Sequence, residues 1–207
     1  MPRARLSAAR LLGLDRSGPP PPQSAPDAPW RPWTLPNLIG YVRAALIPAI
    51  LVLEYRSRSG TDAAAGVCFF VAGAGDYLDG IAARVTGQYS RMGTLLDPVV
   101  DRLLAVSGLA VCWSYELLPR WLVALVLARE VLMLVLGQAW VRRGMAVRIN
   151  WPGRIAVGPT LFGIWLSLLG VRHVAEGFVI AGIALALVAT AYYVRDAVRQ
   201  LRLSSSA

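Results

Sequence analysis

The sequence predicts an all-α, polytopic membrane protein with six transmembrane helices. Of its 207 residues, 56% are hydrophobic and only 16% are charged, whereas about a quarter of the residues in a soluble domain are charged. The apolar residues also gather in stretches, and about 20 of them are needed to cross a bilayer. The six expected spans are 35–55, 62–84, 92–115, 121–140, 155–169 and 174–194.

The basic residues indicate how these spans are oriented. The formal net charge is +9, and the arginines concentrate before the first span, in 84–91, in 142–154 and after the last span. The loop with Arg56 and Arg58 is an exception. The positive-inside rule therefore predicts cytoplasmic N and C termini, which agrees with an even number of spans. We expect the excess of basic residues to contact an anionic membrane surface and not nucleic acid. The chain is therefore expected to be an integral protein of a bacterial plasma membrane.

The chain divides into three expected parts. Residues 1–32 are basic and Pro-rich and have no hydrophobic face, which predicts a disordered tail. Residues 33–202 form the six-helix membrane domain, since this length suits one domain. Residues 203–207 are expected to be a flexible C-terminal end.

Four carboxylates lie near the ends of two apolar stretches: Asp76, Asp79, Asp97 and Asp101. Each costs about 2.5–3.5 kcal/mol at a lipid-facing helix centre, so we expect them to face a polar site. The first two are three residues apart and the last two are four apart, so each pair shares a helix face. A short loop joins the two helices. Their acidic faces are therefore expected to meet near the cytoplasmic surface.

Such a cluster favours a divalent cation. Close carboxylates repel one another, and oxygen ligands select hard ions such as Mg²⁺ or Mn²⁺. Gly80, Ala83 and Gly93 leave room for a ligand on the same faces, and Arg84 can pair with a phosphate. Two alternatives remain open from the residues alone, namely structural salt bridges and a carboxylate-lined ion or proton transporter.

The spacing Asp76-x2-Asp79-Gly80-x2-Ala83-Arg84-x8-Gly93-x3-Asp97-x3-Asp101 resembles the signature of the CDP-alcohol phosphotransferase family. The resemblance implies an enzyme that transfers a phosphatidyl group from CDP-diacylglycerol to an alcohol and releases CMP. It implies a site for two divalent ions on the four aspartates, with Asp101 also the catalytic base. It further implies a CDP-lipid pocket formed by Gly80, Ala83, Arg84 and Gly93, and a homodimer.

The start of the first span resembles the phosphatidylglycerophosphate synthase and cardiolipin synthase branches of that family, in Thr34-Leu35-Pro36-Asn37-Leu38 and in 43–48. Asn37 is expected either to contact the nucleotide or, as the commoner role, to cap the helix. Arg43 either faces the phosphates of the site or extends to the membrane interface.

The acceptor is expected to be a glycerol-type alcohol, either glycerol-3-phosphate or phosphatidylglycerol. The candidate acceptor-binding residues are Arg43, Arg129, Arg154 and Arg195. The Arg129–Glu130 neighbours resemble these branches, although a structural ion pair is the alternative. The stretch 155–169 has no charged residue, which argues against glycerol-3-phosphate as the acceptor and makes phosphatidylglycerol a competitor. Inositol phosphate is a third choice.

Overall fold

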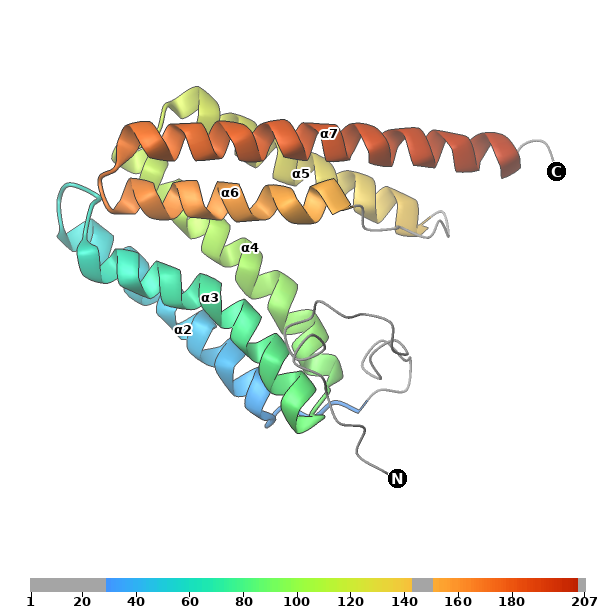
Figure 1. The fold of residues 1–207 in the computed structure, drawn as a ribbon, viewed down its shortest axis with the longest axis horizontal. Helices are drawn as coiled ribbons and strands as arrows, with labels where there is room; N and C mark the ends of the chain where they lie inside the picture. The colour runs from blue at the N-terminus through green and yellow to red at the C-terminus, as the bar shows by residue number, and fades with distance from the viewer. Residues whose placement is uncertain (1–28, 143–150, 205–207) are drawn as a thin grey trace. The chain divides into compact units, whose positions relative to one another are not determined.

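The structure is a computed structural model that describes residues 29–142 and 151–204. Every regular element in these residues is an α-helix, which confirms the all-α prediction (Figure 1). Most of the tail assigned to 1–32 and the C-terminal end lie outside the described residues. The helices are α2 (Leu35–Arg56), α3 (Ala63–Thr86), α4 (Arg91–Ser114), α5 (Arg120–Arg142), α6 (Trp151–Leu168) and α7 (Arg172–Ser204).

The six described helices fall where the six spans were predicted. Three of them are long and apolar enough to cross a membrane: α2, α3 and the part Arg172–Tyr192 of α7. The apolar part of α6, Ala156–Leu168, is shorter, whereas α4 and α5 carry charged residues in mid-helix. Within residues 29–142 and 151–204 a helix is thus present at each of the six expected places, and the crossing of the membrane by all six stays a prediction.

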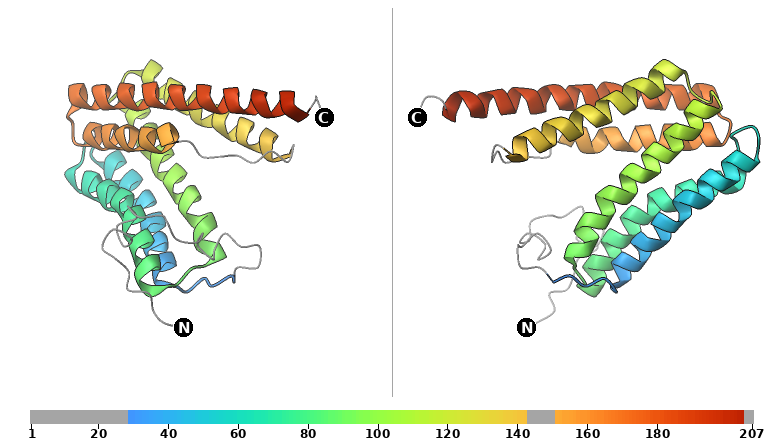
Figure 2. Two further views of the ribbon diagram at one scale, coloured as in Figure 1. Left: turned by 45° about the vertical axis from the view of Figure 1, so that its right-hand side comes forward. Right: turned by 180° about the vertical axis from the view of Figure 1, so that it is seen from behind.

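The chain forms two compact units, and the boundary between them falls within α4 after Ser107. The first unit contains α2, α3 and the first part of α4, which lie side by side in Figures 1 and 2. Small residues let these helices approach closely. A Cβ atom added at Gly40 would lie only 2.6 Å from Cδ2 of Leu96.

The outward faces of this unit are apolar. Side chains such as Val42, Val67 and Phe70 are more than half exposed, while the inward faces of α2 and α3 carry polar and charged residues among the small ones. A water-soluble helix shows the opposite pattern, with its apolar stripe turned inward. This arrangement is therefore suited to lipid.

The second unit contains the loop Ser57–Ala63, the end of α4, and α5 to α7. Helix α6 packs along α7, as Figure 2 shows. The contact again uses glycines, because a Cβ atom at Gly163 would lie 2.5 Å from Cγ2 of Val179 and one at Gly182 would lie 2.2 Å from Oγ1 of Thr160. The turn into α7 contains Gly170, whose φ of 79° suits glycine.

Candidate active site

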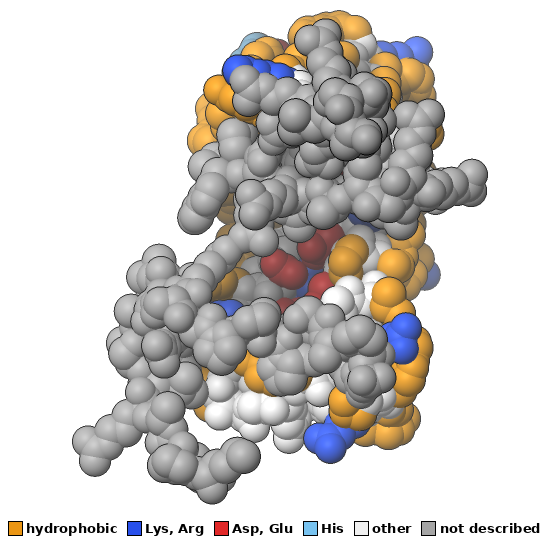
Figure 3. All heavy atoms as spheres, turned by 90° about the vertical axis from the view of Figure 1, so that its right-hand side faces the viewer, with side chains coloured by type: hydrophobic (Ala, Val, Ile, Leu, Met, Phe, Trp, Pro, Cys, Tyr) orange, Lys and Arg blue, Asp and Glu red, His pale blue; other side chains and the backbone are white. Residues whose placement is uncertain are grey.

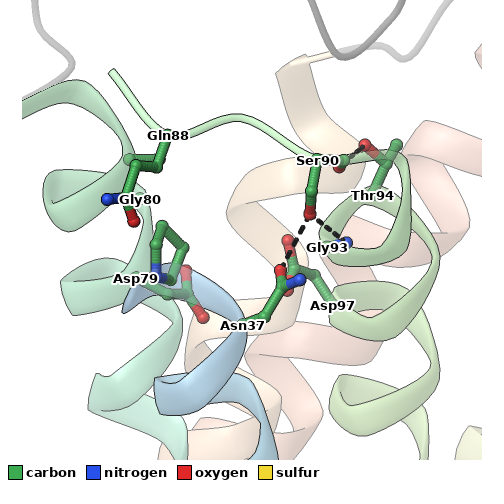
Figure 4. A pocket seen from close by; sticks show the side chains of 10 residues that line it. Asn37, Asp79, Gly80, Gln88, Ser90, Gly93, Thr94 and Asp97 are labelled. Carbon is green, nitrogen blue, oxygen red and sulfur yellow. Dashed lines mark hydrogen bonds between the residues drawn. The ribbon is translucent and has the colours of Figure 1, made fainter. Parts of the chain in front are cut away.

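A pocket of about 70 Å³ opens where the N-terminal ends of α2 and α4 meet the C-terminal part of α3. Figure 4 shows side chains from all three helices around it. All of its lining residues belong to the first unit. They are Pro36, Asn37, Asp79, Gly80, Ala83, Gln88, Ser90, Gly93, Thr94 and Asp97. Six of these ten residues are sites predicted from the sequence, and the structure brings them together.

The start of α4 is held by Ser90. Its Oγ accepts a hydrogen bond from the backbone N–H of Gly93 at 3.0 Å and donates one to Oδ1 of Asn37 at 3.0 Å (Figure 4). Ser90 is therefore the N-cap of α4, since a capping oxygen accepts from an N–H of the first turn. The same hydroxyl fixes α4 against α2.

Asn37 joins separate parts of the chain. Its Nδ2 donates to the carbonyls of Arg31 at 2.8 Å and Pro32 at 3.1 Å, and its Oδ1 accepts from Ser90. The cap of α2 is Thr34, whose Oγ1 accepts from the N–H of Asn37 at 3.4 Å. The hydrogen bonds of the Asn37 amide thus join parts of the protein, and the capping role expected of Asn37 belongs to Thr34, three positions earlier.

Two further contacts attach the chain before α2 to the loop before α4. The N–H of Leu35 donates to Oε1 of Gln88 at 2.9 Å, and the N–H of Arg91 donates to the carbonyl of Pro29 at 3.2 Å. The Arg91 guanidinium also lies over the Trp30 ring, 5.3 Å from its centre. This end of the first unit is therefore fixed around the pocket.

Pocket residues Gln88, Ser90 and Thr94 were not predicted. Ser90 carried a usable signal, because a serine directly before a helical stretch is a typical N-cap. Pro98 lies four residues after Thr94 in α4 and has no N–H that could donate to the Thr94 carbonyl. The Thr94 carbonyl therefore lacks the usual helical hydrogen bond from the residue four positions later.

Arg43 lies in the middle of the aspartates. Although it sits on α2, it is only 1% exposed. Its Nη1 donates to Oδ2 of Asp79 at 3.0 Å and lies 3.5 Å from Oδ1 of Asp76, and its Nη2 donates to Oδ1 of Asp101. Of the two expected orientations, the structure has the one that faces the site.

The four aspartates differ in exposure. The side chain of Asp79 is 7% exposed, whereas those of Asp76 and Asp101 are 52% and 41% exposed. Asp97 is intermediate and lines the pocket with Asp79. Figure 3 shows acidic side chains gathered at one place on the face that it displays. The cluster therefore has a buried inner member and members open to a ligand.

The donor chemistry of this cluster fits a hard divalent cation, because it offers four carboxylates from two adjacent helices. As the side chains stand, no group of three or more His, Cys, Asp or Glu among the described residues is arranged to hold a metal ion. Arg43 instead engages one oxygen of each of three carboxylates. The role of the aspartates as metal ligands stays a prediction.

The remaining predicted residues are distributed as follows. Gly80 and Ala83 line the pocket, and a Cβ atom at Gly80 would lie 3.4 Å from Nη1 of Arg84, which places that guanidinium beside the pocket wall. In the second unit, Arg129 pairs with Glu130 on α5, as the structural alternative expected. Arg195 is exposed on α7, and Arg154 lies on α6 with its side chain outside the described part.

Apolar helices around a carboxylate-lined pocket place this chain among helical membrane proteins with an acidic site. The chain belongs to the CDP-alcohol phosphatidyltransferase family, because residues 33–192 match the profile of that family. This match includes α2 to α6 and most of α7. It confirms the family that the signature of 76–101 resembles.

Three bacterial relatives illustrate the names that similar proteins carry. A cardiolipin synthase (CMP-forming) of Streptomyces coelicolor is 36% identical over 140 residues, which are 66% of this chain and 65% of that protein. A probable phosphatidylglycerophosphate synthase of Mycobacterium tuberculosis is 32% identical over 174 residues, 81% of this chain and 83% of that protein. A CDP-diacylglycerol–glycerol-3-phosphate 3-phosphatidyltransferase of Bacillus subtilis is 28% identical over 149 residues, 66% of this chain and 77% of that protein. The chain thus spans about 65% of the length of the cardiolipin synthases that it matches.

Proposed function

We propose that this chain transfers a phosphatidyl group from CDP-diacylglycerol to a glycerol-type alcohol and releases CMP. The observation that carries the proposal is the pocket, in which Asp79 and Asp97 lie with Gly80, Ala83 and Gly93. These five residues come from two helices and are all part of the family signature. A carboxylate-lined ion path explains the aspartates but gives no reason for the small residues at their positions.

The chain's own residues have separate roles in this reaction. The four aspartates would hold two Mg²⁺ or Mn²⁺ ions, which would supply positive charge to neutralise the pyrophosphate and the departing CMP. Gly80 and Ala83 admit the CDP group, and Arg84 pairs with its phosphates. Asp101 takes the proton of the acceptor hydroxyl as that oxygen bonds to phosphorus and the bond from phosphorus to the CMP oxygen breaks.

Asp101 is proposed as the base because it stands at the base position of the family signature, and its side chain, 41% exposed, is far more accessible than that of Asp79. A proton acceptor must come within hydrogen-bond distance of the incoming alcohol, and the inner carboxylate is too enclosed. The hydrogen bond that Arg43 donates to Asp101 fixes one oxygen of this carboxylate. The proton then passes to the other oxygen.

We propose glycerol-3-phosphate or phosphatidylglycerol as the acceptor, with Arg129, Arg154 and Arg195 as candidate contacts. The names of the relatives support both alcohols, since they include cardiolipin and phosphatidylglycerophosphate synthases. The uncharged stretch 155–169 favours the less anionic headgroup of phosphatidylglycerol. Inositol phosphate is included as the third acceptor in the test described below.

We further propose that all six helices span a bacterial plasma membrane, with both termini and the active site on the cytoplasmic side and with two copies of the chain forming a homodimer. The apolar outer faces of α2 and α3 support the membrane assignment. The pocket lies at the helix ends joined by the loop between Arg84 and Arg91. A basic loop at that end supports a cytoplasmic site.

The test is CMP release by the purified chain in lipid nanodiscs with CDP-diacylglycerol and Mn²⁺ or Mg²⁺. Glycerol-3-phosphate, phosphatidylglycerol and inositol phosphate are offered separately, and the lipid product is identified by mass spectrometry. We expect Asp97→Asn to reduce CMP release to background, because the pocket then loses a carboxylate that a metal ion needs. The change is isosteric, so folding is expected to persist.

Glu116→Gln is the matched control, since it neutralises an acidic side chain that is 66% exposed and paired at the surface with Arg120. This variant is expected to keep wild-type turnover. Folded wild-type protein that releases no CMP with any of the three acceptors would refute the proposal. Metal flux into liposomes without CDP-lipid would support the transporter instead.

A further inference from the structure

The guanidinium of Arg43 is buried in the first unit, where a cation needs compensation. Taking a charge out of water is costly unless ion pairs and hydrogen bonds replace its hydration. Arg43 obtains these from Asp79, Asp101 and Asp76, and from the backbone carbonyl of Ala72, which accepts from its Nε at 2.8 Å. Each of the three guanidinium nitrogens thus has a partner.

Gly75 creates the space for this arrangement. A Cβ atom at that position would lie 2.7 Å from Cδ and 2.8 Å from Cγ of Arg43. Real Cβ atoms do not approach other atoms so closely. The aliphatic part of the Arg43 side chain can therefore cross α3 because residue 75 has no side chain. About one turn earlier in α3, the carbonyl of Ala72 accepts a hydrogen bond from Nε–H of Arg43.

The guanidinium and a divalent cation would need the same carboxylates. Arg43 contacts three of the four aspartates, which lowers the negative charge available to an incoming ion. Two like charges a few ångströms apart repel strongly away from bulk water. At the same time, the arginine offsets the repulsion among the aspartates when no metal ion is present.

We propose that Arg43 is a resident counter-ion of the aspartate cluster, which competes with the divalent cation and sets the affinity of the site for metal. This inference rests on the metal site of the proposed function. Arg43 is then a positioning residue that acts through Asp79 and Asp101. This role is proposed here in place of the acceptor contact that the sequence led us to expect for Arg43.

The experiment measures Mn²⁺ affinity of the full-length chain in nanodiscs, from the free-Mn²⁺ electron paramagnetic resonance signal. We expect Arg43→Met to bind Mn²⁺ about tenfold more tightly than wild type or better, because a nearby positive charge is gone. Without metal, the melting temperature of this variant is expected to fall below that of wild type. The stabilisation by saturating Mn²⁺ is therefore expected to be larger in the variant.

The matched control is Arg56→Met, the same substitution at the exposed C-terminal end of the same helix. It lies 13 positions from Arg43, which is about 20 Å along a helix, and is expected to leave Mn²⁺ affinity unchanged. Arg43→Lys is the second variant, used if the methionine variant does not fold. An ammonium cannot hold two carboxylates and a carbonyl in one plane, so we expect binding several-fold tighter than wild type.

The possible results separate this inference from the proposed function. If wild type binds Mn²⁺ and the folded Arg43 variants bind it no more tightly, the counter-ion role is overturned while the metal site stands. If neither wild type nor the variants bind Mn²⁺, the metal site itself fails, and the inference fails with it. If the Arg43 variants bind Mn²⁺ more tightly than wild type and Arg56→Met does not, the result supports both the metal site and the counter-ion role.

Discussion

At the scale of single residues, the two signature glycines in the pocket have different reasons to be glycine. A Cβ atom at Gly93 would lie 2.8 Å from Oδ1 of Asn37, so the protein itself excludes a side chain there. A Cβ atom at Gly80 would meet only the flexible end of Arg84, at 3.4 Å. The bare surface of Gly80 is therefore available to a ligand.

This contrast gives a prediction. Gly80→Ala should leave the melting temperature unchanged or raised, since alanine favours a helix by up to about 1 kcal/mol, yet lower CMP release at least about tenfold by misplacing the CDP group. Gly93→Ala should lower the melting temperature, because it separates α4 from Asn37. Unfolding and turnover measured on the same samples check both. Full turnover in Gly80→Ala would place the nucleotide elsewhere.

The residues of the site were predictable to different degrees. Asp79, Asp97 and the small residues followed from spacing and from the family signature, and the pocket unites them. The partners of Arg43 could not be predicted from the sequence, because they depend on how α2 packs against α3 and α4. A single sequence shows that an arginine lies about two turns into an apolar stretch, but the choice between lipid interface and carboxylates is made by tertiary contacts.

At the scale of elements, the start of α4 depends on one hydroxyl. Ser90 caps the helix and also donates to the buried Asn37 side chain. The carboxylates of Asp97 and Asp101 lie one and two turns further along the same helix. Their placement therefore follows from the position of this helix end.

Removing the hydroxyl tests this dependence. Ser90→Ala should lower the free energy of unfolding by about 2 kcal/mol, because a lost N-cap costs about 0.5–2 kcal/mol and the Asn37 oxygen loses a buried donor. Denaturant unfolding in detergent measures the change. Thr86→Ala, which removes an exposed hydroxyl at the end of α3, is the control. Equal losses in the two variants would contradict the capping role.

Helix positions were more predictable than helix ends. All six expected spans coincide with helices, because long apolar stretches are a strong signal. The ends differ more. Helix α6 begins at Trp151 instead of 155, and α7 continues to Ser204 instead of 194. The prediction followed hydrophobicity, which marks the part of a helix that suits lipid, whereas a helix continues into polar sequence wherever its backbone bonds persist.

At the scale of the whole molecule, the proposed orientation in the membrane is open to a direct test. Helix α3 has 24 residues and is about 36 Å long at 1.5 Å per residue, enough to cross the hydrocarbon core. Ser59 precedes this helix and Thr86 ends it, and both are exposed. The two positions should therefore face opposite sides of the membrane.

A single cysteine introduced at either position, with Cys68 and Cys112 replaced by alanine, shows which side of the membrane that position faces. We expect an impermeant thiol reagent to label Ser59→Cys in intact bacterial cells, and to label Thr86→Cys only after the membrane is opened. The physical reason is the basic loop after α3, which the positive-inside rule retains in the cytoplasm. Labelling of both cysteines in intact cells would contradict a membrane-crossing α3.

The close contact between Gly75 and Arg43 also constrains how the sequence can change over evolution. A side chain at position 75 and an arginine at position 43 exclude each other sterically. A larger residue at 75 would displace the Arg43 side chain from its present path, and with it the cation among the aspartates. We therefore expect these two positions, 32 apart in the sequence, to change together among relatives, although the family signature begins only at the residue after Gly75.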